Sequence, residues 1–265
     1  MAKLKKIDLD KITGLPNIIA LDKKLKERQS LYFDGILYSF KMIESSYQGL
    51  INVLSLISEN SLNKKELSQD FDIDSWALVY IWSIIDSTHR LRLLLAEAPG
   101  VDRKLKFISD FFSQTKNIKD FRDFMQHMNR EIGGLIDQKK PLWGSISWIF
   151  TKENQYNIFL LHVGSFPGDR SINFPVPTGT KTVSIPIDSI NLNLSSHNIE
   201  ISEIIKSLKI IEDLIKKIDK NPLGYPRGVL FSAKLGLEAK EDSLLTNTPI
   251  KDNIPSIGQK PVDPV

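Results

Sequence analysis

The sequence contains no cysteine among its 265 residues. This absence excludes disulfide-stapled folds, thiolate zinc sites, iron–sulfur clusters and cysteine nucleophiles. A chain without cysteine suits a reducing compartment, where disulfides are rare. The cytoplasm is therefore the expected location.

The sequence also lacks a long apolar run. Its most apolar stretch, residues 76–85, is about half of the roughly 20 residues that span a bilayer, and Asp86 follows it directly. The first 21 residues begin basic, but they carry Asp8 and Pro16 where a secretion signal needs an uninterrupted apolar segment. We expect a soluble protein with no export signal and no membrane partner.

The sequence also lacks a large excess of charge of either sign. The 35 Lys and Arg residues against 32 Asp and Glu residues leave a net charge of +3, which is too small for a surface devoted to polyanions. A glycine-rich phosphate loop, an HExxH motif and a GxSxG motif are all absent, and the four histidines form no spaced metal motif. We therefore expect any nucleic-acid site to be local, and we expect neither a metal nor a cofactor.

The chain divides into four segments by its pattern. We expect a lead-in at residues 1–35 with one short helix at 20–29, a helical bundle at 36–140, a β extension plus a helix at 141–220, and an extended tail at 221–265. The predicted fold class is α+β, mainly α: helices first, then a small antiparallel β segment and a long C-terminal helix.

The helical segment shows clear periodicity. A stripe at alternating spacings of four and three predicts a helix that begins at residue 36: Ile36, Phe40, Ile43, Tyr47, Leu50, Leu54 and Ile57. A second helix over about 72–98 is apolar nearly all round, so we expect it to be central in the bundle or covered by a partner subunit. A shorter helix follows from residue 102, and a fourth helix is predicted over 117–138.

The later segment is rich in β-formers. Residues 145–150 and 156–163 predict a hairpin, 181–193 predict one or two further strands, and 198–219 predict a helix with a broad apolar face. The hairpin region is rich in aromatic residues that can either stack unpaired bases or pack in the core: Trp143, Trp148, Phe150, Tyr156 and Phe159.

The second helix carries a polar cluster. Asp86, His89 and Arg90 lie three and four residues apart, so they share one helical face. Buried ions are costly unless they are paired. The cluster is therefore either a structural ion network or part of a water-filled site, and both interpretations stay open.

The fourth helix carries a second polar cluster. Asp123 and His127 are four residues apart, so the carboxylate can orient the imidazole, although His127 can equally pair with Glu131 within the helix. On an ideal helix Arg122 points roughly 140° away from His127. The two side chains can meet over one anion only if the helix frays or a second copy contributes. Arg122 has no acid three or four residues away, so it must seek an anion off its helix or lie in solvent.

The segment Arg122-Asp-Phe-Met-Gln-His127 resembles the Arg-x4-6-His signature of HEPN domains, the nucleotide-binding helical bundles of higher eukaryotes and prokaryotes. The longer stretch FRDFMQHMNREIGGL is similar to the family's pattern, and WSIIDSTHRLRLLL resembles its polar second helix. The resemblance covers about 100 residues and implies a HEPN-like up-and-down bundle that forms homodimers. Catalytic members most often have Asn after the arginine, where this chain has Asp123.

The resemblance implies metal-independent endoribonuclease activity of a defence or toxin type, with RNA cleaved between two subunits. In that interpretation His127 transfers protons, Arg122 stabilises charge at phosphorus, and Asp123 holds the imidazole. Asp86, His89 and Arg90 are supporting residues, and no metal takes part. RNA or a nucleotide, a second copy, and an antitoxin or neighbouring gene product are the candidate partners. The alternative is a non-catalytic HEPN-like module that binds nucleotide or protein and dimerises.

Overall fold

The computed structural model describes residues 23–63, 71–99, 101–164 and 186–218. All of them belong to the first of two units into which the chain divides, residues 1–225. The described part is a mainly helical α+β structure, as the sequence predicted: helices come first, followed by a four-stranded antiparallel sheet and a helix. The predicted tail at 221–265 lies outside the described residues, and so do residues 181–185 of the predicted strand region.

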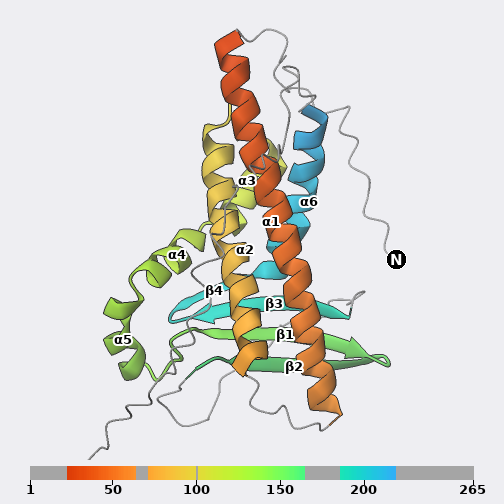
Figure 1. The fold of residues 1–265 in the computed structure, drawn as a ribbon, viewed down its shortest axis with the longest axis vertical. Coiled ribbons are helices and arrows are strands. Elements are labelled where there is room, and N and C mark those ends of the chain that lie inside the picture. The colour runs from red at the N-terminus through yellow and green to blue at the C-terminus, as the bar shows by residue number, and fades with distance from the viewer. Residues whose placement is uncertain (1–22, 64–70, 100, 165–185, 219–265) are drawn as a thin grey trace, which may run out of the picture. The chain divides into compact units, whose positions relative to one another are not determined.

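Two long helices, α1 (Lys23–Leu62) and α2 (Phe71–Glu97), pack against each other (Figure 1). Six members of the predicted stripe on α1 are buried, and Tyr47 is half-buried. The predicted start of this helix at residue 36 is wrong, because α1 begins at Lys23. Phe33 extends the buried stripe toward the N-terminus, and Gly35, which looked like a helix breaker, is a contact point: a Cβ there would lie 3.1 Å from Leu94 of α2.

The described part of the chain does not cover α2 on all sides. Its inner face is buried through residues such as Ile81 and Ile84. Trp76, Val79 and Leu93, however, are 53%, 54% and 56% exposed. α2 is therefore not buried on all sides, as a central helix would be. Its outer face is apolar and accessible.

Three short helices follow: α3 (Lys106–Gln114), α4 (Ile118–Gln126) and α5 (Met128–Asp137). The predicted continuous helix over 117–138 is wrong, because the helix is interrupted at His127 with backbone angles φ −119° and ψ 21°. α4 buries three residues (Ile118, Phe121 and Phe124), whereas α5 buries Leu135 alone. The two segments therefore present their apolar residues along different directions, and a turn at His127 accommodates both.

The sheet has the strand order β2-β1-β3-β4, and every neighbouring pair is antiparallel. The predicted hairpin is confirmed as β1 (Ser145–Lys152) and β2 (Gln155–His162), and Glu153 and Asn154 both take positive φ in its two-residue turn. β3 (Ile187–Leu194) lies on the other side of β1. β4 (His197–Glu200) pairs with β3, so the last helix, α6 (Ile201–Ile218), starts later than the predicted residue 198.

Helices and sheet share one apolar core. The Trp148 indole is buried, stacks on Phe159 with ring centroids 5.4 Å apart, and donates a 2.9 Å hydrogen bond from Nε1 to Oγ of Ser58 on α1. Trp148 and Phe150 thus pack in the core, whereas Tyr156 is 59% exposed. No described helix is both long and apolar enough to cross a membrane.

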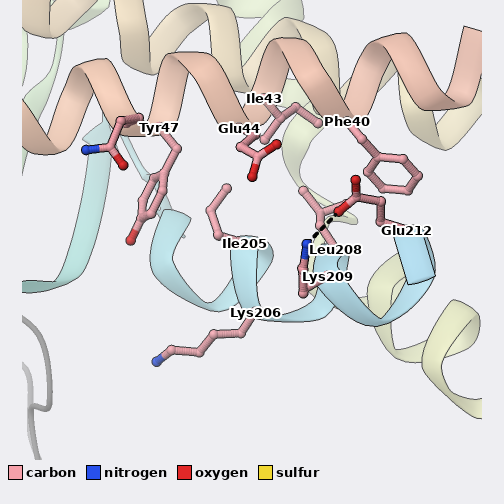
Figure 2. A pocket seen from close by; sticks show the side chains of 10 residues that line it. Phe40, Ile43, Glu44, Tyr47, Ile205, Lys206, Leu208, Lys209 and Glu212 are labelled. Carbon is pink, nitrogen blue, oxygen red and sulfur yellow. Dashed lines mark hydrogen bonds and ion pairs between the residues drawn. The ribbon is translucent and has the colours of Figure 1, made fainter. Parts of the chain in front are cut away.

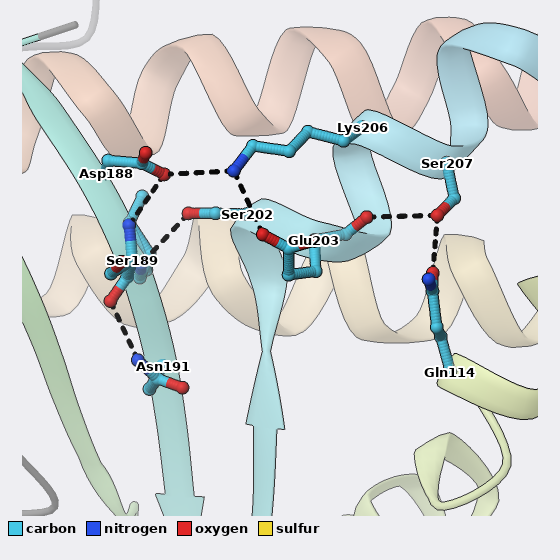
Figure 3. A network of polar contacts seen from close by, with 9 residues as sticks. Gln114, Asp188, Ser189, Asn191, Ser202, Glu203, Lys206 and Ser207 are labelled. Carbon is cyan, nitrogen blue, oxygen red and sulfur yellow. Dashed lines mark hydrogen bonds and ion pairs between the residues drawn. The ribbon is translucent and has the colours of Figure 1, made fainter. Parts of the chain in front are cut away.

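A polar network fixes the start of α6 against β3 (Figure 3). Ser202 Oγ accepts a 2.9 Å hydrogen bond from the backbone N–H of Ile190. The Lys206 ammonium lies 3.6 Å from Asp188 Oδ1 and 3.0 Å from Glu203 Oε1. These contacts set the position of α6 beside α1, which it also contacts.

Candidate functional site

Asp86 on α2 is the centre of the predicted polar cluster. Its Oδ2 lies 2.7 Å from Nη2 of Arg90, one turn further along the same helix. Its Oδ1 accepts a 3.3 Å hydrogen bond from Nε of Arg122 on α4. One carboxylate therefore holds two guanidinium groups, and these three side chains together carry a net charge of +1.

The position of Arg122 follows from the packing of its neighbour. Phe121 is buried, and its ring is tilted against the indole of Trp82 on α2 with centroids 6.5 Å apart. Trp82 and Asp86 are four residues apart and share one face of α2. Docking Phe121 on Trp82 consequently brings Arg122 to Asp86. Arg122 therefore pairs with a carboxylate on another helix and is not left to solvent alone.

His89 belongs to the same cluster and is only 8% exposed. Burial lowers the pKa of His89, and the positive charge of Arg122 lowers it further, while Asp86 acts in the opposite direction. Its Nδ1 is buried and has no hydrogen-bond partner among the described residues. The electrostatics favour a neutral imidazole beside the Arg122 guanidinium.

A groove of about 240 Å³ runs between α2 and α4 beside this cluster. Most of its lining surface is apolar, and Asp86 and Arg122 are its charged lining residues: Trp82, Ile85, Asp86, Arg122, Met125 and Gln126. The sequence did not single out Trp82 or Met125 for this role. The signal in the sequence was their spacing of four and three residues from Asp86 and Arg122.

The structure does not bring Asp123 and His127 together. His127 is exposed at the junction of α4 and α5. No hydrogen bond or ion pair joins its ring to Asp123 or Glu131 in the described part of the chain, and Asp123 Oδ2 lies 4.0 Å from Nζ of Lys119 instead. His127 is the C-cap of α4: its backbone N–H still donates a 3.0 Å hydrogen bond to the Asp123 carbonyl, but its backbone angles, φ −119° and ψ 21°, are no longer helical.

Arg92 has a structural role next to the cluster. Its Nη1 donates to the Phe112 carbonyl at 2.6 Å and to Thr115 Oγ1 at 2.5 Å. Its guanidinium also lies over the Phe112 ring, 5.0 Å from the centroid. Arg92 therefore ties the end of α3 to α2, and its N–H groups serve packing rather than a ligand.

A second pocket, about 320 Å³ in volume, lies between α1 and α6 (Figure 2). Three of its α1 residues, Phe40, Ile43 and Tyr47, belong to the apolar stripe predicted from the sequence, and no sequence motif indicated a pocket there. Phe40, Ile43, Ile205 and Leu208 form its apolar part, and Glu44, Tyr47, Lys209 and Glu212 are among its polar residues. Burial raises the pKa of Tyr47, which the Ser202 hydroxyl partly opposes.

Within the described residues, no group of three or more histidine, aspartate or glutamate side chains is placed to hold a metal ion. Comparisons of the chain with protein-family models, with curated proteins and with solved structures gave no match. The HEPN resemblance thus stays a prediction, carried by the residues of α2 and α4.

Proposed function

We propose that the protein is a metal-independent endoribonuclease of the HEPN type, of the defence or toxin class, which acts in the cytoplasm as a homodimer. The observation that carries the proposal is the Arg122 guanidinium, held through Nε by Asp86, with both residues lining a groove. Nε makes the one hydrogen bond of Arg122 found in the described part of the chain, so both terminal nitrogens can bind an RNA phosphate.

Each motif residue has a physical role in this proposal. Arg122 stabilises the negative charge that develops at phosphorus, and Arg90 adds a second positive charge on the same carboxylate. His127 is exposed and can reach the ribose 2′-hydroxyl or the leaving oxygen, where an imidazole transfers protons near neutral pH. Arg122 faces α2 while His127 lies at the helix junction, so a second copy supplies the histidine that completes each site.

The test is cleavage of single-stranded RNA in the presence of EDTA. Arg122→Ala and His127→Ala should each abolish cleavage and toxicity on expression while the fold stays intact, because neither side chain fills the core. Arg103→Ala, which removes an exposed arginine outside the cluster, is the matched control and should cleave like the wild type. Wild-type protein that leaves a varied RNA pool uncut, with no effect of Arg122→Ala on growth, would contradict the proposal.

A second candidate function is a non-catalytic module that binds a nucleotide or a partner protein, such as an antitoxin or a neighbouring gene product. The observation that favours it is the acid beside Arg122: Asp86 pairs with its guanidinium, and Asp123 follows it directly, so less positive charge is left for a phosphate. Asp123→Asn separates the two functions. A phosphate site should tolerate or gain from the loss of negative charge, and cleavage should persist or rise. A protein that binds nucleotide without cleaving RNA in either form fits the module.

A further inference from the structure

The pocket between α1 and α6, which we call the α1/α6 pocket, is formed by matching faces of two helices. Phe40, Glu44 and Tyr47 lie four and three residues apart on α1. Ile205, Lys209 and Glu212 repeat the same spacing on α6. Each wall therefore combines an apolar side chain with a charged one, so the pocket can bind a molecule that has both an apolar body and a charged group.

The charges of the pocket are unevenly paired. Lys209 Nζ lies 3.1 Å from Glu212 Oε2, so these two side chains neutralise each other. Lys206 is held by Glu203 and Asp188 (Figure 3), and in Figure 2 its ammonium group points away from the other lining residues. No cation lies within ion-pair distance of Glu44 among the described residues, and Figure 2 shows its carboxylate directed toward α6.

The electrostatics agree with an excess of negative charge. The pKa of Lys209 is raised, first by its hydrogen bond to Glu212 and then by the charges of Glu212, Asp213 and Glu44. The charges of these three carboxylates act on the Lys209 ammonium, and two of them, Glu44 and Glu212, line the pocket. An added anion would meet repulsion there, whereas an added cation would be attracted.

We propose that the α1/α6 pocket binds an amphipathic organic amine, with its ammonium group paired to Glu44 and its apolar body against Phe40, Ile205 and Leu208. The volume of about 320 Å³ is near the lower limit of small-molecule pockets, so the body is one or two rings or a short branched chain. Neither Arg122 nor His127 takes part, so this site and the proposed ribonuclease site stand or fall separately.

Isothermal titration calorimetry with four aromatic probes of different charge tests the charge requirement. Tryptamine and 2-phenylethylamine carry the ammonium group, 2-phenylethanol is the neutral counterpart, and 3-phenylpropionate is the anionic one. We expect the amines to bind, the alcohol to bind about tenfold or more weakly, as the loss of one charged hydrogen bond implies, and the acid not to bind. Equal binding of amine and alcohol, or no binding of either amine, would overturn the proposal.

Three variants of the full chain place the amine in this pocket. Glu44→Gln keeps the shape and removes the charge, so amine affinity should fall about tenfold, to the level of the alcohol. Ile205→Ala should weaken the binding of both amine and alcohol, because it removes apolar contact from the body of the ligand. Glu59→Gln, an exposed glutamate elsewhere on α1, is the matched control and should bind like the wild type.

Thermal melting of each variant separates loss of binding from loss of structure. Glu44 and Glu59 are both exposed, so neither substitution should change the fold. An unchanged amine affinity in folded Glu44→Gln, or an equal loss in Glu59→Gln, would show that the ammonium group does not pair with Glu44.

Discussion

His89 makes the stability of the protein depend on pH. Burial and the charge of Arg122 lower its pKa in the folded chain, whereas an unfolded histidine titrates at about 6.5. Below that pH the unfolded chain binds a proton that the folded chain resists, so the free energy of unfolding should fall as pH decreases through the folded pKa. The stabilising contribution is fully present above about pH 6.5. His162, whose pKa is also lowered by burial, acts in the same direction.

Urea unfolding at about pH 7.5 and about pH 5.5 measures this effect. His89→Gln should reduce the difference between the two pH values, because it removes one of the two imidazoles whose pKa is lowered in the folded chain. His127→Gln, which removes an exposed histidine outside the core, is the matched control. If the free energy of unfolding of His89→Gln changes with pH as much as that of the wild type, burial of His89 does not cause the pH dependence.

For single residues, the sequence predicted side-chain pairs in the interior of a helix better than pairs at the end of a helix. Asp86 and Arg90 pair because both lie inside α2, where the spacing of four residues is fixed. The lack of an acid near Arg122 on its own helix left two alternatives open, an anion off the helix or solvent, and the structure shows the first, with Asp86 as the partner. The expected Asp123 to His127 pair is absent from the structure because helical geometry ends at His127.

Glycine at position 49 sets the spacing between α1 and α2. A Cβ there would lie 2.5 Å from Cε1 and Cζ of Tyr80. Gly49→Ala should therefore lower the free energy of unfolding by about 1 kcal/mol, because overpacking of about 1–3 kcal/mol outweighs the gain in helix propensity. Urea unfolding provides the measurement.

Gly133→Ala on α5 is the matched control, because no atom lies within 4 Å of its ideal Cβ. It should raise the free energy of unfolding by about 0.5–1 kcal/mol through helix propensity alone. Tyr80→Leu should reduce the cost of Gly49→Ala when the two are combined, as expected for residues in direct contact. A Gly49→Ala protein as stable as Gly133→Ala would show that the Tyr80 ring shifts without cost.

Element types were predictable where the local pattern agrees with the packing. The hairpin followed from two runs of β-formers around a short polar turn, and Glu153 and Asn154 form that turn. The start of α1 was missed because the predicted apolar stripe was followed only from Ile36, whereas Phe33 continues it and Gly35 lies in close contact with Leu94. β4 was missed because the pairing partner of residues 197–200 is β3, and the apolar period of α6 runs directly on from them.

Sites formed between elements depend on contacts that the sequence does not display. The α1/α6 pocket joins Glu44 with Lys209, and only the packing of α6 between β3 and α1 brings them together. The Asp86 to Arg122 contact likewise needs Phe121 to dock on Trp82. Periodicity predicts that each of these residues lies on a helix, but it does not predict which helices pack against each other. For this reason the α1/α6 pocket was not found from the sequence, and the Asp86 to Arg122 contact was only suggested.

The distribution of exposed apolar residues bears on how copies of the chain associate. Trp76 and Val79 of α2 are 53% and 54% exposed, and Ile132 and Ile136 of α5 are 43% and 57% exposed. Residues of this size are costly to leave in water and are common at interfaces between subunits. We expect a homodimer through α2 and the α4–α5 segment, which also lets one copy bring His127 to the Arg122 of the other.

Light scattering at micromolar concentration measures the association. Ile136→Glu should shift the protein toward a monomer, because it places a charge in the proposed interface, and RNA cleavage should fall with it. Leu31→Glu is the control: Leu31 is 73% exposed on α1, away from the proposed interface, so the dimer should persist. A monomeric wild type, or an equal loss of dimer in both variants, would contradict the proposal that two copies of the chain form each site. Cleavage that survives in a monomeric Ile136→Glu protein would mean that a single copy holds every group the reaction needs.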